Sequence, residues 1–261
     1  MKVNKKILIA AGIITVLGAA VAGGAVALII SSSAGEAAHD SKVIDEKVSK
    51  IVVNARMSDV RFVSGNNDKI YVSYPAEGAN AGKAEVNGDT LTISYEQSKE
   101  RWYDYIGLDF GQDNKIFIEV PKGMIADARI ETEYGDIEAE GVGGKLYADA
   151  KNGDIEISHC DFDNLECITG LGDIEIKNTD AKTVDCRTSD GDIDFERLDG
   201  GIIELSADLG DIEGLMSGME TDYTINADTE LGDNNLINRT GGEKTLNVKV
   251  RMGDIAVRFA D

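Results

Sequence analysis

Apolar and polar residues alternate on both sides of a Gly-Asp pair that recurs through the second half of the chain. The positions seven, five and three residues before each glycine are mostly apolar or small, and those between them are mostly polar. After the pair, isoleucine follows at once in six of seven copies, and a second apolar residue often stands two positions later. A period of two is the signature of a half-buried β-strand. The pattern therefore predicts units of strand, Gly-Asp corner and strand.

The corner recurs at nearly constant spacing. Successive glycines are 18, 19, 19, 19, 22 and 21 residues apart. A unit of this length cannot bury its own apolar face, so neighbouring units must stack to share one core. The seven predicted corners are Gly135-Asp136, Gly153-Asp154, Gly172-Asp173, Gly191-Asp192, Gly210-Asp211, Gly232-Asp233 and Gly253-Asp254.

The fold class predicted from this repeat is all-β. Identical apolar positions at fixed offsets favour a β-solenoid or a closely related stacked β-prism of ~19-residue Gly-Asp-Ile repeats. The alternative is an antiparallel β meander in which every corner is a hairpin, because a short corner also suits hairpins. Residues 128–261 carry the regular repeats, and residues 49–127 carry a degenerate version of the pattern. We expect the latter to cap the stack, since terminal repeats are usually atypical.

The N-terminal segment differs in kind from the rest of the chain. Residues 7–30 form an uncharged run of 24 residues, long enough for a transmembrane helix. Lys2, Lys5 and Lys6 precede the run and acid-rich sequence follows it, which predicts an N-terminus inside the cell. We therefore expect a cytoplasmic tail (1–6), an anchor (7–30), a flexible linker (31–48) and an extracellular ectodomain (49–261). A cleaved signal peptide is the alternative, and it also exports the remainder.

The distribution of charge narrows the range of partners. The chain has a formal net charge of −22, and all 48 acidic residues follow the apolar run, together with 23 of the 26 basic ones. The ectodomain therefore carries about −25, a charge that repels nucleic acid and favours cations or a basic partner. We expect the membrane as one partner, through the N-terminal helix, and an envelope or surface protein or glycan as the other.

The acidic residues of the repeat have two interpretations. At the corner, glycine supplies a left-handed backbone and the aspartate accepts a nearby backbone N–H, which makes the pair a turn device. Stacked carboxylates also raise the alternative of weak Ca²⁺ binding, although the period does not match the nine-residue half-coil of calcium β-rolls. Two positions after each aspartate, parallel stacking would align an outward acidic column of Glu138, Glu156, Glu175, Asp194 and Glu213. A solvated face is the default interpretation of this column, and we expect no resident cofactor.

Two further groups of side chains carry candidate chemistry. Trp102, Tyr103 and Tyr105 lie in an insertion between two predicted strands. Exposed aromatic rings can stack on sugar rings, which makes this insertion the best candidate ligand loop on the chain, although capping of an open strand edge is the favoured interpretation. Cys167 and Cys186 hold the same inward offset in adjacent units, and Cys160 holds another. We expect buried small apolar side chains there and no disulfide framework.

These motifs resemble a known bacterial family. The order of Asp59-Val60-Arg61-Phe62, Leu91-Thr92-Ile93 and Ile116–Pro121 before the Gly-Asp-Ile units is similar to the putative-adhesin β-strand-repeat family, a domain of unknown function found in LiaG-like envelope proteins. The resemblance covers nearly everything after residue 48. It implies an exported, stacked β fold with an envelope-associated role, and it supplies no catalytic residue.

The expected function is therefore a membrane-anchored, extracellular, non-catalytic binding or structural module. The alternative that the resemblance suggests is an accessory protein of an envelope-stress response. A carbohydrate-active enzyme of the β-helix kind is disfavoured, because such enzymes need acids gathered with Arg or Lys on one loop face. The outward strand bases Arg129, Arg187 and Lys249 are instead scattered.

Overall fold

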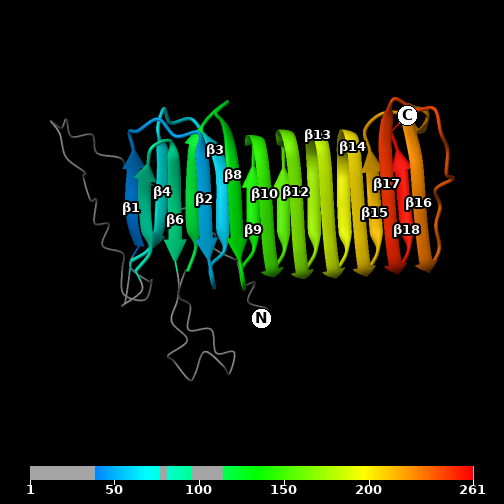
Figure 1. The fold of residues 1–261 in the computed structure, drawn as a ribbon, viewed down its shortest axis with the longest axis horizontal. Helices are drawn as coiled ribbons and strands as arrows, with labels where there is room; N and C mark the ends of the chain where they lie inside the picture. Colours follow the sequence, from blue (N-terminus) through cyan, green and yellow to red (C-terminus); the bar gives the residue numbers. More distant parts are fainter. Residues whose placement is uncertain (1–38, 77–80, 96–113, 261) are drawn as a thin grey trace, which may run out of the picture.

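The structure is a computed structural model that describes residues 39–76, 81–95 and 114–260. Its described residues are organised as 18 β-strands and one short 3-10 helix, in an elongated body (Figure 1). The all-β prediction is therefore confirmed. Among the described residues, no helix is long and apolar enough to cross a membrane. The predicted anchor at residues 7–30 lies outside the described part of the chain.

The strands before the regular repeats are short. They are β1 (His39–Ile44), β2 (Lys50–Ala55), β3 (Val60–Gly65), β4 (Ile70–Pro75), β5 (Lys83–Asn87), β6 (Thr90–Tyr95) and β7 (Ile116–Pro121). Strand β1 occupies part of the segment predicted as the 31–48 linker, and its six residues pair with β4. Residues 39–44 of the predicted linker therefore supply an edge strand to the N-terminal end of the stack.

The strands of the regular repeats range from 4 to 17 residues, and the two longest bend around the body. They are β8 (Ile125–Thr132), β9 (Ile137–Glu140), β10 (Gly143–Asn152), β11 (Ile155–Ser158), β12 (Asp161–Leu171), β13 (Ile174–Asp190), β14 (Ile193–Leu209), β15 (Ile212–Met216), β16 (Tyr223–Leu231), β17 (Lys244–Met252) and β18 (Ile255–Phe259). The 3-10 helix spans Glu220–Asp222.

The strands make two faces that enclose one core. Face A has the order β5-β6-β2-β8-β10-β12-β13-β14-β17-β16, and face B has the order β1-β4-β7-β3-β9-β11-β13-β14-β15-β18. Strands β13 and β14 belong to both faces because each continues around the bend. The long buried columns of isoleucine, leucine, valine and alanine from both faces form a single cluster.

The Gly-Asp corners join coils and not hairpins. Strands β10 and β11 flank Gly153-Asp154 but do not pair with each other. Strand β10 pairs in parallel with β8 and β12, and β11 pairs in parallel with β9 and β13. Equivalent residues of adjacent units face each other, as at Cys167 and Cys186. The antiparallel strand pairs of the described residues are β1–β4, β4–β7 and β5–β6, all near the N-terminal end. The regular repeats therefore stack as coils, and the meander alternative is wrong for them.

The spatial order of the coils differs from their order in the chain at both ends. The coil of β2 and β3 lies inside the stack, between the coil of β6 and β7 and the coil of β8 and β9. At the other end, β17 lies between β14 and β16, so the last coil in sequence is the second to last in space. Part of the segment predicted as capping repeats, residues 50–65, is consequently an internal coil.

Candidate functional site

The Gly-Asp corners form one continuous ladder of hydrogen bonds along an edge of the stack. The carboxylate of each corner aspartate except Asp233 accepts the backbone N–H of the aspartate in the next coil, as in the 2.8 Å bond from Asp173 N to Asp154 Oδ1. In return, the isoleucine that follows an aspartate donates its N–H to the carbonyl of the next aspartate, as Ile155 does to Asp173 at 2.9 Å. The carboxylates that accept such bonds are those of Asp59, Asp136, Asp154, Asp173, Asp192, Asp211 and Asp254.

The corner aspartates accept backbone N–H groups, and each donor belongs to the neighbouring coil. The bond therefore acts between units, whereas an Asx turn would act within one. Asp233, at the spatial end of the ladder, donates its own N–H to Asp254 Oδ1 at 2.8 Å. A carboxylate used in this way keeps its charge while fixing the register of two coils.

The corner glycines are required by close approach. A Cβ placed on Gly191 would lie 2.0 Å from the carbonyl oxygen of Gly172, and one on Gly172 would lie 2.2 Å from that of Gly153. The backbone at Gly191 has φ of 155°, in a region open mainly to glycine. In several coils a threonine completes the corner, since Thr188 Oγ1 donates to Gly172 O at 3.0 Å. The Gly-Asp pair is thus a stacking device of the whole edge.

The predicted acidic column exists on face B. Glu138, Glu156, Glu175, Asp194 and Glu213 are register neighbours in that order. Burial raises the pKa of Asp194, and the charges of Asp192 and Glu213 raise it further.

Basic side chains partly neutralise the acidic column. Arg61 closes one end, with Nη2 3.2 Å from Glu138 Oε1, and Lys177 pairs with Glu175. Among the described residues, no group of three or more His, Cys, Asp or Glu side chains is placed to hold a metal ion. The structure thus gives the Ca²⁺ interpretation no coordination site in these ranges.

The cysteines have the packing that the sequence predicts. Cys160, Cys167 and Cys186 are all buried and free. The hydrogen bond between Cys167 and Cys186, together with burial, holds the pKa of Cys167 well above its ordinary value. Burial raises the pKa of Cys160 to about 11. The thiols of Cys160 and Cys167 are therefore protonated, poorly nucleophilic parts of the core.

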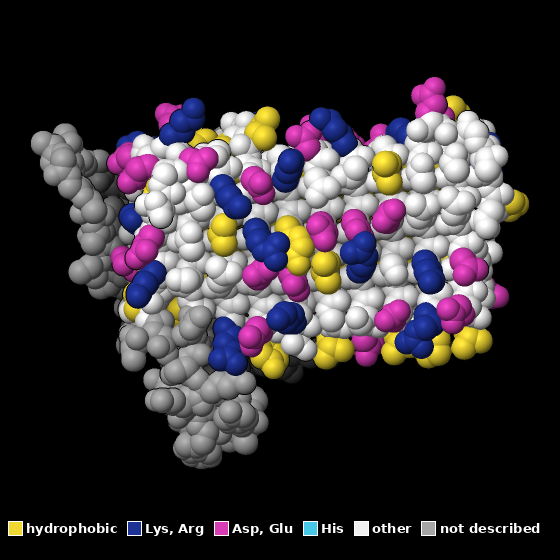
Figure 2. Space-filling view, in the orientation of Figure 1, with side chains coloured by type: hydrophobic (Ala, Val, Ile, Leu, Met, Phe, Trp, Pro, Cys, Tyr) yellow, Lys and Arg dark blue, Asp and Glu magenta, His cyan; other side chains and the backbone are white. Residues whose placement is uncertain are grey.

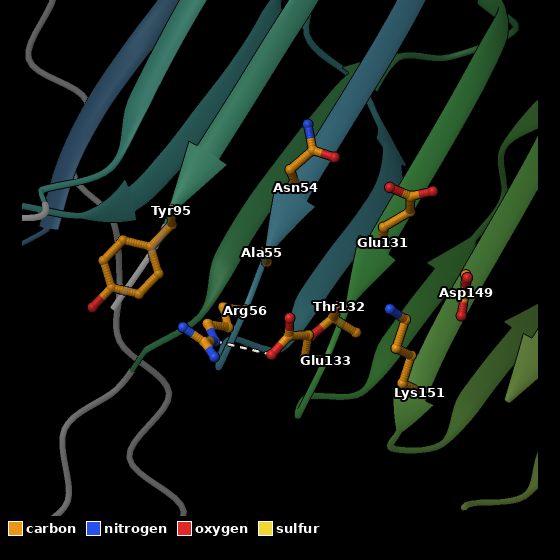
Figure 3. A pocket seen from close by; sticks show the side chains of 9 residues that line it. All are labelled: Asn54, Ala55, Arg56, Tyr95, Glu131, Thr132, Glu133, Asp149 and Lys151. Atoms are coloured by element: carbon orange, nitrogen blue, oxygen red, sulfur yellow. Dashed lines mark hydrogen bonds and ion pairs between the residues drawn. The ribbon is translucent and has the colours of Figure 1, made fainter. Parts of the chain in front are cut away.

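A groove on face A is the best described candidate for ligand binding (Figure 3). It has a volume of about 390 Å³ and lies where β2, β8 and β10 reach the corner edge. Arg56 Nε donates to Glu133 Oε2 at 2.9 Å across its floor. The residues that line it are Asn54, Ala55, Arg56, Tyr95, Glu131, Thr132, Glu133, Asp149 and Lys151. Donors and acceptors alternate along this groove, which suits a ligand rich in hydroxyl groups.

The groove adjoins the end of β6. Tyr95 lines it and is the last residue of β6, directly before the 96–113 segment. Strand β6 pairs in parallel with β2, which pairs with β8, so Tyr95 lies at the edge where β2 and β8 also end. The predicted ligand loop with Trp102, Tyr103 and Tyr105 lies outside the described residues, and its role stays a prediction.

Sequence reasoning missed the groove, although a signal was present. Arg56, Glu133 and Lys151 hold one offset in three coils that are adjacent in space, and their charges alternate. The first of these coils is not the sequence neighbour that the repeat spacing suggests. The alternation could be seen only after the coil of β2 and β3 had been placed beside β8.

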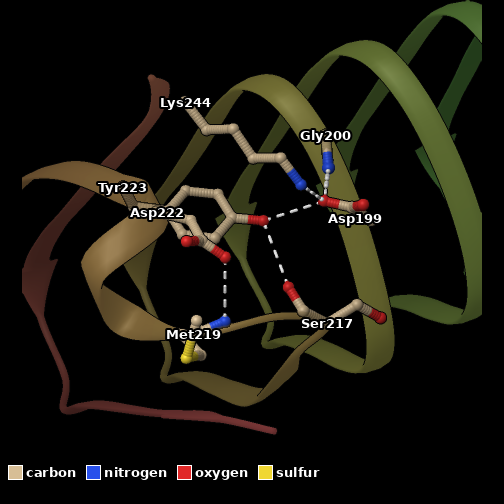
Figure 4. A network of polar contacts seen from close by, with 7 residues as sticks. All are labelled: Asp199, Gly200, Ser217, Met219, Asp222, Tyr223 and Lys244. Carbon is tan, nitrogen blue, oxygen red and sulfur yellow. Dashed lines mark hydrogen bonds and ion pairs between the residues drawn. The ribbon is translucent and has the colours of Figure 1, made fainter. Parts of the chain in front are cut away.

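The C-terminal end of the stack holds a second polar cluster that the sequence did not reveal (Figure 4). Asp199 Oδ1 accepts hydrogen bonds from the Tyr223 hydroxyl at 2.9 Å, from Gly200 N at 2.8 Å and from Lys244 Nζ. Burial alone would raise the pKa of Asp199, but the bonds from Lys244 and Tyr223 bring it below its ordinary value. Because Tyr223 is fully buried, this cluster holds β14, β16 and β17 together at the C-terminal end of the stack, which is a structural role.

Comparison with known proteins agrees with this architecture. The family model described as Toastrack DUF4097 matches residues 48–261. Among curated proteins, none matches this chain. A crystal structure of a "putative adhesin" from Bacteroides fragilis is 15% identical, with 84% of this chain and 97% of that chain covered and a TM-score of 0.51. This likeness supports the fold.

Two other solved structures are similar over the same range at lower TM-scores. A "putative cell adhesion protein" from Clostridium sporogenes is 14% identical, covers 85% of this chain and 99% of its own, and gives a TM-score of 0.36. A "putative adhesin" from Parabacteroides distasonis is 16% identical, with 85% of this chain and 98% of that chain covered and a TM-score of 0.36.

Proposed function

Because the chain belongs to the Toastrack DUF4097 family, we propose that it is a non-catalytic binding module of the adhesin type, held at the cell surface. Residues 7–30 anchor it as a single-pass helix with the N-terminus inside, and the β-repeat body stands outside. The basic residues before the run and the acidic chain after it support this orientation.

One observation carries the non-catalytic part of the proposal. The most regular carboxylates of the chain, those of the corners, are engaged in backbone hydrogen bonds between coils. A carboxylate fixed in this way serves rigidity and is poorly placed to shuttle protons. The repeat therefore acts as a stiff scaffold that presents side chains on its outer faces.

We place the ligand of this module in the groove of Arg56 and Lys151. Donors from these two residues face acceptors from Glu131, Glu133 and Asp149, a pairing that matches the hydroxyl groups of a glycan. Arg56 and Lys151 hold the same position in their coils, and one coil, that of β8, lies between them. A linear polymer lying across the strands would therefore contact one base and then the other.

The binding test uses purified full chain and isolated bacterial envelope polysaccharide. A variant with Arg56→Ala and Lys151→Ala should bind at least about tenfold more weakly, as expected for the loss of two charged hydrogen bonds. The matched control is Lys182→Ala with Arg258→Ala, which removes the same charge from exposed sites outside the groove. Equal binding by the groove variant and the control would reject this site.

The location test is independent of the ligand. Protease added to intact cells should degrade a C-terminal epitope tag on the full chain and should leave an N-terminal tag intact. Protection of both tags would place the β-repeat body inside the cell and would overturn the anchored orientation.

A further inference from the structure

The residue before each corner glycine forms a second row along the corner edge, and this row is largely apolar. In spatial order, register neighbours at this position are Asn152, Leu171, Asp190, Leu209, Met252 and Leu231, and Tyr134 holds the same offset before Gly135. The last three of the register neighbours are contiguous. We call the row the corner rim.

Most large side chains of the corner rim are exposed to solvent, and Leu209 is half-buried. Leu231 is 66% exposed, Leu171 55%, Tyr134 51% and Met252 41%. Figure 2 shows hydrophobic side chains along the lower edge of the body, where the strands of the regular repeats end. An alternating strand should turn such positions inward or fill them with polar residues, so large apolar side chains repeated here indicate a contact surface.

A row of carboxylates runs beside the rim. The corner aspartates stand two positions after the rim residues, and only the side-chain-free glycine lies between them. Asp136, Asp154, Asp173, Asp233 and Asp254 are exposed. Each corner that contributes to the ladder uses Oδ1 to accept a backbone N–H, which holds the carboxylate in place without removing its charge. The edge is thus amphipathic, because an apolar row and an anionic row run parallel along the stack. Successive residues within each row are about 4.8 Å apart, the spacing of neighbouring strands.

We propose that the corner rim and its aspartates bind a basic amphipathic peptide segment of a partner protein. Apolar side chains of the segment would cover the leucine row, and its lysine or arginine side chains would pair with the aspartates. Charge decides among the occupants: an anionic lipid surface and a second copy of a chain of net charge −22 would both meet the aspartates with like charge. This inference rests on the proposed function as a binding module and adds a second surface to it.

The test measures binding of a fluorescent peptide to the full chain in zwitterionic lipid nanodiscs, with empty nanodiscs as the blank. The probe is an amphipathic peptide of lysine and leucine, compared with a peptide of the same charge in which serine replaces leucine. The rim variant carries Leu171→Ser, Leu231→Ser and Met252→Ser. The control variant carries Val43→Ser, Ile125→Ser and Ile202→Ser, which change residues of matching exposure, at 49%, 75% and 48%.

The expected result is at least a tenfold weaker affinity for the lysine–leucine peptide in the rim variant alone, with unchanged circular dichroism. The lysine–serine peptide should bind wild type at least tenfold more weakly than the lysine–leucine peptide. Equal affinities for the two peptides, or equal affinities of the rim and control variants, would overturn the proposal.

Two other outcomes would assign the rim to a different occupant and also overturn the proposal. One is a dimer in sedimentation that only the rim variant loses, and the other is binding to added anionic vesicles that only the rim variant loses. Envelope polysaccharide provides the separating control, because it is expected in the Arg56 groove. If the wild-type chain binds polysaccharide but not the peptide, only the proposed peptide site at the rim is rejected. If the wild-type chain binds no polysaccharide, the proposed function is rejected.

Discussion

The two edges of the stack make the same kind of turn under different constraints. At the corner edge, glycine occurs in all seven repeats. At the opposite edge, the equivalent residues of four coils are Gly141, His159, Asn178 and Arg197, all with φ between 47° and 67°. Five of the seven corner glycines have positive φ, as do these four residues, yet only the corner edge is always glycine.

The difference shows that crowding, more than φ, selects glycine here. The left-handed region near 50° costs a residue with a side chain about 1–3 kcal/mol but admits it. At the corner edge a Cβ would meet a carbonyl oxygen of the next coil at 1.9–2.3 Å, which no local adjustment accommodates. One edge is therefore fixed by the stacking of backbones, and the other is free to vary its side chains.

The largest expected effect is the loss of a corner glycine. Gly191→Ala places a Cβ 2.0 Å from Gly172 O at φ of 155°. We expect the free energy of unfolding to fall by about 4 kcal/mol or more, because two coils must separate. Urea denaturation followed by circular dichroism measures it.

The control for this prediction is Gly88→Ala. Gly88 also has positive φ, at 64°, but nothing lies within 4 Å of a Cβ added there. Its loss should be about 1 kcal/mol, the strain of the backbone alone. Equal losses at the two sites would mean that φ selects the corner glycines and that crowding does not.

The next effect is smaller and concerns the threonine that completes a corner. Thr188→Val keeps the shape of the buried side chain but removes the donor to Gly172 O, at a cost of about 1–2 kcal/mol. The register neighbour of Thr188 is Ala207, which offers no hydroxyl. Urea denaturation of variants at Thr188 and at Ala207 compares the free energy of unfolding at a corner that has this bond with that at a corner that lacks it.

The matched change at the next corner runs in the opposite direction. Ala207→Thr should bring a hydroxyl to Gly191 O and stabilise the fold relative to Ala207→Val, which adds equal volume. A valine variant as stable as the threonine variant at both positions would show that the hydroxyl contributes nothing to the corner.

Much of the corner edge could be predicted from the sequence because its determinants are local. The Gly-Asp spacing and the alternating columns specify the units, their inward residues and the in-register acidic column. The identity of the N–H donor could not be predicted, since it lies in another coil. Asp173 N and Asp154 Oδ1, for example, are 19 residues apart.

The order of the coils and the groove could not be predicted for the same reason. Placing β2 between β6 and β8 depends on how the chain returns after β4 and β5, and no repeat records that path. The exchange of β16 and β17 likewise depends on long-range contacts such as those of Asp199 with Tyr223 and Lys244. Local alternation fixes what a strand buries but leaves open which strand lies beside it.

The third prediction uses pH to separate acids on the two edges. Asp194, near the corner edge, has a raised pKa because of burial and like charge, so its ionisation opposes folding. Asp199, on the opposite side, has a lowered pKa: burial opposes ionisation, but the bonds from Lys244 and Tyr223 prevail. Asp194→Asn should therefore stabilise the fold at pH 7, and Asp199→Asn should destabilise it, each by about 1 kcal/mol or less because both sites are partly solvated.

The sign of each effect fixes its pH window. The advantage of Asp194→Asn should vanish as pH falls through the raised pKa of Asp194 towards the unfolded value of about 3.9, where the wild-type side chain is also neutral. The deficit of Asp199→Asn should persist to about pH 4 and shrink as pH falls further through the lowered pKa. Unfolding midpoints measured from pH 7 to pH 3 give both curves, and curves of equal sign would contradict the assignment of the two environments.

The smallest predicted effect lies at the opposite edge and follows from its freedom. Arg197 has φ of 55°, where a side chain is strained by about 1–2 kcal/mol, and glycine relieves that strain. Glycine also adds entropy to the unfolded chain, which offsets about half of the gain. Arg197→Gly should therefore stabilise the fold by about 0.5 kcal/mol, whereas Asn178→Gly should change little, because asparagine tolerates this conformation. A loss in Arg197→Gly in urea denaturation would show that the Arg197 side chain makes contacts that outweigh its backbone strain, and that the two edges are under more similar constraints than their sequences indicate.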